Sequence, residues 1–276
     1  MPQDEMPPMQ HAAPAAADPR RTAFFFDLDG TLAPLADTPR AVRVPAGTLA
    51  ALGALARASG GAVAVVSGRA LADLDRLLAP LRLAAAGQHG AELRGPGGRV
   101  RRLPADARRL AEMAASLEPL LARGPGLELE RKGLALALHY RNAPALEEAA
   151  RRAMEDALRG AEGFVLQPGK MVYEIKPRGA SKGAAIAALM ERAAFRGRLP
   201  LFAGDDLTDE AGFDFVQSQG GVSIKIGPGP TRARWRLASP DALAAWLGRL
   251  PGLGPVDARA GQAPGARDNA TSGSRP

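Results

Sequence analysis

The chain has 276 residues, 46% of them hydrophobic, so it is long and apolar enough to bury one large core or two ordinary ones. It contains no cysteine, which excludes disulfides, thiolate metal ligands and cysteine nucleophiles, so any metal must be bound by oxygen or imidazole. The net charge of +7 invites a nucleic-acid hypothesis, but only 4% of the residues are aromatic and no dense block of Lys and Arg occurs, so we expect no nucleic-acid partner.

The two ends of the chain differ from its middle in composition. Residues 1–20 are rich in Pro and Ala, and residues 251–276 in Gly, Pro, Ser and Arg, without hydrophobic periodicity, so both are predicted to be disordered tails. The start of the chain lacks the basic and apolar stretches of a signal peptide, and no apolar run approaches the roughly 20 residues of a membrane span. We therefore expect a cytoplasmic protein that does not contact a membrane.

The first periodic segment, TAFFF at residues 22–26, predicts a strand that is buried on both faces. It delivers Asp27 and Asp29 to its carboxyl end, directly before Gly30 and Thr31. Asp-Gly is also a common turn pair, so a capped turn is the structural alternative. Two carboxylates on one side of the chain, beside a glycine and a threonine, suit a divalent cation with a phosphate next to it.

A second strand-to-helix turn follows the same pattern. A helix predicted over residues 45–58 leads to a buried strand over 62–66, which ends in Ser67, Gly68 and Arg69 before another helical segment. A hydroxyl at such a turn can bind an anion together with backbone N–H groups, although a plain N-cap serine has the same sequence. A third short strand, over 83–86, leads into GQHGAEL, where His89 lies between Gly87 and Gly90, an unusual place for a core histidine.

From about residue 98 the order of elements changes to α-β-β-α-β-β. The helices are predicted over 105–121 and 145–158, and the strands over 127–131, 134–140, 163–167 and 171–176. Hairpins imply an antiparallel sheet, so residues 98–178 are predicted to be an α+β cap inserted into a core formed by residues 21–97 and 179–250.

The final third returns to alternating helices and strands. A helix predicted over 181–194 begins at Lys182, and a strand over 199–203 is followed by GDDLTDE. This run places four acids within six residues, namely Asp205, Asp206, Asp209 and Glu210. Helix capping would not explain four mutually repelling carboxylates so close together, whereas a bound metal ion would. The predicted fold class is therefore α/β, a doubly wound parallel sheet with its site at the carboxyl edge.

The run DLDGTL resembles the first motif of the haloacid dehalogenase (HAD) superfamily of phosphohydrolases, SGR its second motif and GDDLTDE its fourth. The resemblance implies that Asp27 is the nucleophile, that Asp29 is the general acid and base, and that Lys182 takes the place of the third motif. It also implies a Mg²⁺ site formed by Asp27, Asp29, Asp205, Asp206 and Asp209, with Asp29 bound through its backbone carbonyl, and phosphate binding by Thr31, Ser67, Gly68, Arg69 and Lys182.

The pattern HGAE, ELERKG, ALHYR, GKMVYEIKP and SKG resembles trehalose-6-phosphate phosphatases over residues 24–250. The resemblance implies hydrolysis of trehalose 6-phosphate through an aspartyl-phosphate, the final step of trehalose biosynthesis. The implied substrate-binding residues are His89, Glu130, Lys132, Arg141, Lys170 and Glu174. Strand alternation places Glu130 and Lys132 on one face, and likewise Lys170 and Glu174, although a solvated outer face is the structural alternative.

Two other functions fit the same motifs. One is a phosphatase for another phosphosugar, such as sucrose 6-phosphate or mannosyl-3-phosphoglycerate. The other is a non-catalytic phosphosugar-binding regulator, although the presence of both Asp27 and Asp29 argues against it. We expect a monomer whose only partner is its small-molecule substrate.

Overall fold

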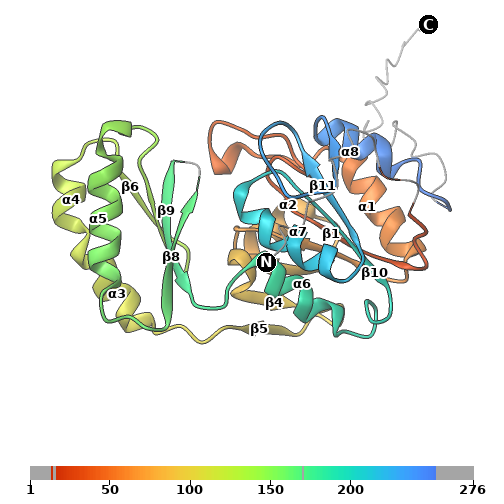
Figure 1. The fold of residues 1–276 in the computed structure, drawn as a ribbon, viewed down its shortest axis with the longest axis horizontal. Helices are drawn as coiled ribbons and strands as arrows, with labels where there is room; N and C mark the ends of the chain where they lie inside the picture. Colours follow the sequence, from red (N-terminus) through yellow and green to blue (C-terminus); the bar gives the residue numbers. More distant parts are fainter. Residues whose placement is uncertain (1–13, 15–16, 170, 253–276) are drawn as a thin grey trace, which may run out of the picture.

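The computed structural model describes residue 14 and residues 17–169 and 171–252 (Figure 1). Most of the two predicted tails, and the predicted substrate residue Lys170, lie outside this part of the chain. Among the described residues, no helix is both long enough and apolar enough to cross a membrane.

The larger unit is built on an eight-stranded sheet in the order β12-β11-β10-β1-β2-β3-β4-β5. The strands are β1 (Thr22–Phe26), β2 (Val63–Val66), β3 (Ala84–Gly87), β4 (Glu92–Arg94), β5 (Val100–Arg102), β10 (Leu199–Gly204), β11 (Val222–Ile226) and β12 (Trp235–Leu237). From β12 to β3 every neighbouring pair is parallel, which confirms the predicted fold class.

Two antiparallel strands at one edge of this sheet were not predicted. β4 pairs with β3, and β5 with β4, in antiparallel register. The reason is the short connection after β3, a single 3-10 turn η2 (Gln88–Gly90), because a parallel return needs a crossover of a dozen or more residues. Because β5 belongs to the large sheet, we propose that the cap begins after Arg102 rather than at residue 98.

Helices cover both faces of the large sheet because β1 is hydrophobic on both sides. Phe24 and Phe26 pack into one buried cluster with α1 (Ala46–Ala58), α2 (Leu71–Leu78) and α8 (Pro240–Leu247). Phe25 points to the other face and packs with residues of the remaining two helices. These are α6 (Lys182–Met190) and α7 (Glu210–Ser218). The alternation follows from the two-residue period of a strand.

The smaller unit is a four-stranded antiparallel sheet in the order β6-β7-β9-β8. Its strands are β6 (Glu128–Arg131), β7 (Leu136–His139), β8 (Phe164–Gly169) and β9 (Val172–Pro177), and its helices are α3 (Ala107–Ser116), α4 (Glu118–Arg123) and α5 (Glu147–Leu158). The described chain also contains the short helices η1 (Pro39–Ala41), η3 (Pro144–Leu146) and η4 (Leu207–Asp209).

This smaller unit, called the cap below, has a hydrophobic cluster of its own, which includes Leu138, Met154 and Ile175. Figure 1 shows its helices on the outer side of its sheet and the larger unit on the other side. The open face of the cap sheet is therefore the one that meets the carboxyl edge of the large sheet.

Candidate active site

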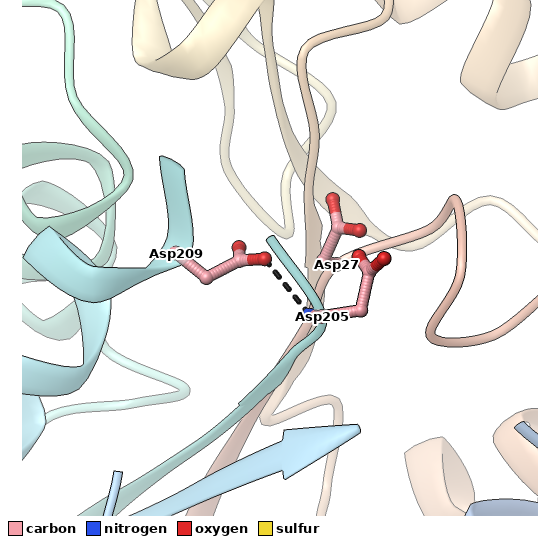
Figure 2. A group of neighbouring side chains, drawn as sticks. All are labelled: Asp27, Asp205 and Asp209. Carbon is pink, nitrogen blue, oxygen red and sulfur yellow. Dashed lines mark hydrogen bonds between the residues drawn. The ribbon is translucent and has the colours of Figure 1, made fainter. Parts of the chain in front are cut away.

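Three acidic side chains meet where the central strands end (Figure 2). Asp27 follows β1 and Asp205 follows β10, its direct parallel neighbour, while Asp209 lies in η4 just beyond. One carboxylate oxygen from each lies within 4.8 Å of the other two. Parallel strands carry their carboxyl ends to the same edge, which brings together residues almost 180 positions apart.

Lys182 joins this group from the start of α6. Its ammonium lies 2.8 Å from Asp27 Oδ1 and 2.6 Å from Asp209 Oδ1, and its side chain is only 3% exposed. Burial by itself lowers the pKa of Lys182, but the two carboxylates outweigh this effect and raise it above its usual value. Lys182 is therefore a permanent positive charge between Asp27 and Asp209.

The group still carries more negative than positive charge. Burial raises the pKa of Asp27 well above its ordinary value, Lys182 opposes that shift, and Asp209 and Asp205 add to it. Burial likewise raises the pKa of Asp205 to about 6, with Asp209 contributing. Three carboxylates facing one ammonium leave an excess of two negative charges when ionised, which a divalent cation would balance.

The donor atoms fit such a cation. Asp205 Oδ1 is buried and has no hydrogen-bond partner among the described residues, and hard divalent cations prefer carboxylate oxygens. Gly30 leaves room for this carboxylate, because a Cβ at that position would lie 2.1 Å from Asp205 Oδ2. Gly30 also has a φ of +77°, which glycine adopts without strain.

Asp209 and Asp206 have different positions in the acidic loop, residues 205–210. Asp209 Oδ2 accepts hydrogen bonds from the backbone N–H groups of Asp205 and Asp206, both at 2.9 Å, while its other oxygen binds Lys182. Asp209 thus holds both the lysine and the loop. Asp206 instead accepts from the N–H of Leu207 at 2.7 Å and caps η4, outside the group of three. Its predicted role at the metal stays a prediction.

Apart from Lys182, the predicted phosphate-binding residues lie shortly after β1 and β2. Thr31 is completely buried and its hydroxyl has no partner among the described residues, which leaves it free for a ligand. Ser67 is also buried, and its Oγ accepts from the N–H of Arg69 at 3.2 Å. A Cβ at Gly68 would lie 2.7 Å from His89 Nε2, so glycine lets His89 approach this turn.

Arg69 and Asp29 lie together but bind each other. The guanidinium donates to Asp29 Oδ2 at 2.7 Å and to Oδ1 at 2.6 Å, a bidentate pair. Burial lowers the pKa of Arg69, but its hydrogen bonds and attraction to Asp29 raise it overall. In this geometry the charged groups of Arg69 and Asp29 bind each other, and the roles predicted for both stay predictions.

Most of the predicted cap residues form one polar cluster beside His89. Glu174 lies 3.2 Å from His89 Nε2 and 3.6 Å from Lys132 Nζ. Lys132 also lies 3.8 Å from Glu130, which binds His139 Nε2 at 3.0 Å. Arg141 is exposed and does not join the cluster.

The charges in this cluster are fixed by its contacts. Burial alone raises the pKa of Glu174, but His89 and Lys132 outweigh it and lower the pKa to about 2. Burial lowers the pKa of His89 even though Glu174 pulls it upward. Glu174 is therefore an anion near neutral pH, and its Oε1 is buried without a partner among the described residues.

Sequence reasoning missed three buried residues at the site. Lys176, two residues after Glu174 on β9, lines a cavity of about 160 Å³ together with His89 and Lys182. The alternation used for Glu174 extends to Lys176 and would have found it. Lys225 donates to the backbone carbonyls of Asp205 and Ile226, and a lysine in a strand buried on both faces is itself a signal. Gln88, which contacts the cap, has no such signal.

The fold and the site together define a class of protein. A doubly wound sheet with an inserted antiparallel cap, and with an Asp–Lys pair and a cation-binding group of carboxylates at the end of its central strand, is the arrangement of an HAD-like phosphohydrolase.

Comparison with known proteins identifies the family. The trehalose-phosphatase family model matches residues 25–241. The trehalose-6-phosphate phosphatase of Escherichia coli (strain K12) is 48% identical over 225 residues, which cover 82% of this chain and 85% of that protein. The chain therefore belongs to the trehalose-phosphatase family of the HAD superfamily, which confirms the resemblance of its motifs.

Solved structures show the same fold at lower identity. The C-terminal domain of the C. albicans trehalose-6-phosphate phosphatase matches with a TM-score of 0.73 and 23% identity, over 83% of this chain and 91% of that one. A haloacid dehalogenase-like hydrolase from B. subtilis matches with a TM-score of 0.60 and 17% identity, over 83% and 99% of the two chains. Both matches concern the fold alone.

Proposed function

We propose that the protein hydrolyses trehalose 6-phosphate to trehalose and phosphate, with Mg²⁺ bound by Asp27, Asp205 and the acidic loop. The observation that carries this proposal is the buried contact of Lys182 with Asp27, beside the unpartnered oxygen of Asp205. The kinship with the E. coli enzyme supports the choice of substrate.

The reaction divides into two half reactions. Asp27 attacks phosphorus and forms an aspartyl-phosphate while Asp29 protonates the departing sugar oxygen; water activated by Asp29 then hydrolyses the intermediate. Lys182 orients Asp27 and offsets charge that builds up on the phosphoryl oxygens. The bound Mg²⁺ would supply the remaining positive charge that a dianionic ester needs beside a carboxylate.

The cap residues support recognition of a sugar. Glu174 and Lys132 face the site as charged groups, and the free oxygen of Glu174 can accept a hydrogen bond from a sugar hydroxyl. A sugar without a hydroxyl at that point would leave a buried carboxylate oxygen unpaired, which disfavours it strongly. Glu130 extends the same row of polar groups through Lys132.

Phosphate release with Mg²⁺ from a panel of esters tests the proposal. We expect the highest kcat/KM for trehalose 6-phosphate, with sucrose 6-phosphate, mannosyl-3-phosphoglycerate and glucose 6-phosphate well below it. A preference for one of the others would move the protein to that substrate. Tight binding of trehalose 6-phosphate without turnover would identify a regulator instead. We also propose that the protein is a monomer. Its molar mass, measured by light scattering during size-exclusion chromatography, tests this.

A further inference from the structure

Two consecutive residues between the large sheet and the cap have unusual backbone geometry. Gln88 and His89 have φ values of +49° and +54°, although neither is glycine, and their side chains are buried. Left-handed backbone in two successive non-glycine residues costs energy, of order 1 kcal/mol or more for each, and persists only where surrounding contacts hold it. The contacts of this pair therefore indicate what it does.

The backbone N–H groups of the pair donate hydrogen bonds to the turn at Ser67–Arg69, the SGR motif. The N–H of Gln88 donates to the carbonyl of Arg69 at 2.8 Å, and the N–H of His89 donates to the carbonyl of Ser67 at 3.0 Å. Both carbonyls belong to the turn after β2, where Ser67 is proposed to hold the phosphate. The position of Gln88 is thus fixed relative to that turn.

The side chains of the pair reach in the other direction, into the cap. Gln88 Oε1 accepts a hydrogen bond from the N–H of Leu134 at 3.0 Å, in the turn between β6 and β7. His89 binds Glu174 on β9. Among the hydrogen bonds of the described residues, these two join the larger unit to the cap sheet away from the chain connection after β9, where the N–H of Ala180 donates to the carbonyl of Pro177.

The contact of Gln88 lies next to a residue that faces the substrate. Leu134 is two residues from Lys132, and its N–H also donates to the Lys132 carbonyl at 3.0 Å. Gly133 between them has a φ of +81°, which gives the turn its tight reversal. Loss of the Gln88 acceptor would therefore leave the Leu134 N–H paired within the cap, so the cap could fold but its turn would no longer be held.

We propose that Gln88 is a positioning residue that docks the β6–β7 turn, and with it Lys132, against the phosphate-binding turn at Ser67–Arg69. Binding of the phosphoryl group orders one side of this contact, and docking of the cap orders the other, so each favours the other. This role does not involve the proposed nucleophile Asp27. The inference that a sugar phosphate benefits from this docking rests on the proposed function.

The test compares two variants that differ in the acceptor. Gln88→Met keeps the length and burial of the side chain but has no carbonyl, whereas Gln88→Glu keeps an acceptor oxygen at the same position. We expect Gln88→Met to raise KM for trehalose 6-phosphate about tenfold while kcat changes less than about threefold. Gln88→Glu should recover most of the loss. For p-nitrophenyl phosphate, which has no sugar for the cap to bind, kcat/KM should be the same in all three proteins.

An equal loss with both substrates would show a merely structural role and overturn the proposal, and so would an unchanged KM in Gln88→Met. Hydrogen exchange gives a readout that does not depend on the substrate. We expect the Leu134 amide to exchange faster in Gln88→Met than in the wild type, while amides of β7 and β9 keep their protection, and we expect Gln88→Glu to restore it. Unchanged exchange at Leu134 would overturn the docking itself, even if the enzyme proves to act on a different phosphosugar.

Discussion

Charge balance at a single residue connects the buried site with its chemistry. Asp27 is buried and its pKa is raised above its ordinary value by that burial, yet a nucleophile must be ionised. Lys182 lowers this cost, and a divalent cation beside Asp205 would lower it further. In the proposed mechanism, Asp27 therefore becomes reactive when a divalent cation is bound.

Asp27→Asn tests the nucleophile. Asparagine keeps the shape of the side chain and an oxygen for Lys182 but cannot form the aspartyl-phosphate, so we expect kcat to fall by at least about 10³-fold. Substrate affinity, measured by calorimetry, should stay the same or increase because a negative charge near the dianion is removed. Asp73→Asn, an exposed carboxylate on α2, is the control. Activity within tenfold of wild type would refute the assignment.

Lys176 is a buried cation for which the described part of the chain provides no hydrogen-bond or ion-pair partner. It makes no hydrogen bond and no ion pair within the described residues, and burial lowers its pKa from 10.5 to about 8, although Glu174 opposes the shift. Below pH 8 both the folded and the unfolded chain carry this proton, and the folded state bears the cost of a buried ammonium. Between pH 8 and about 10.5 the unfolded chain binds more protons, so stability from this group rises with pH.

Lys176→Met should therefore stabilise the free protein at pH 7, and its advantage in Tm over the wild type should shrink as the pH rises from 8 towards 10. The same change should raise KM for the anionic substrate, because the cavity loses a positive charge. Lys225→Met is the matched control and should lower Tm, since the Lys225 ammonium binds two backbone carbonyls. A lower Tm for Lys176→Met at pH 7 would contradict this account.

The motifs in the sequence were sufficient to predict several of the side chains that the structure brings together in the candidate site. Asp27, Ser67, Lys182 and Asp205 follow predicted strands or begin a predicted helix, so their convergence follows from parallel topology. The sequence did not allow us to predict which side chains contact one another. Nothing in the sequence indicates that Arg69 binds Asp29, 40 positions away, or that Gln88 binds a backbone N–H in the cap.

At the level of elements, the differences between prediction and structure have local causes. The helix predicted over 105–121 is two helices, α3 and α4, because Pro119 can occupy only the first turn of a helix. The helix predicted over 181–194 ends earlier, at Met190. Its predicted end rested on the hydrophobic pattern alone. Gly133 marks the turn of one cap hairpin, but Pro168-Gly169, the turn expected for the other, belong to β8 and pair with β9, so β8 is longer than the strand predicted over 163–167.

Because the cap has its own hydrophobic cluster, we expect a mutation there to destabilise the cap independently of the larger unit. Met154 on α5 is completely buried in that cluster, so Met154→Ala should destabilise the cap by about 2–5 kcal/mol. Hydrogen exchange should become faster in β7 and β9 but not in β1 or β10. Leu55→Ala, on α1 in the cluster of the larger unit, is the matched control and should show the reverse pattern. Equal acceleration in both units for either variant would show a single cooperative unit.

On the scale of the whole molecule, the active site lies between two units that are weakly joined. The chain enters the cap after β5 and leaves it after β9, and few polar contacts cross between the sheets. Polar interfaces of this kind permit relative motion of domains. The proposed mechanism would use such motion, because the site has to exclude bulk water while Asp27 attacks and to admit one water in the second step.

We therefore expect the free protein in solution to sample more open arrangements than the docked one, and substrate groups to select the docked one. X-ray scattering should show a smaller radius of gyration with Mg²⁺, a tetrahedral phosphate mimic and trehalose present together than with any one of them alone, because docking needs contacts from both units. Gln88→Met should need more trehalose to reach the same radius, since its docking contact is lost. Scattering curves that coincide with and without the ligands would show that the cap is fixed, and water would then have to reach Asp27 through a cavity of constant shape.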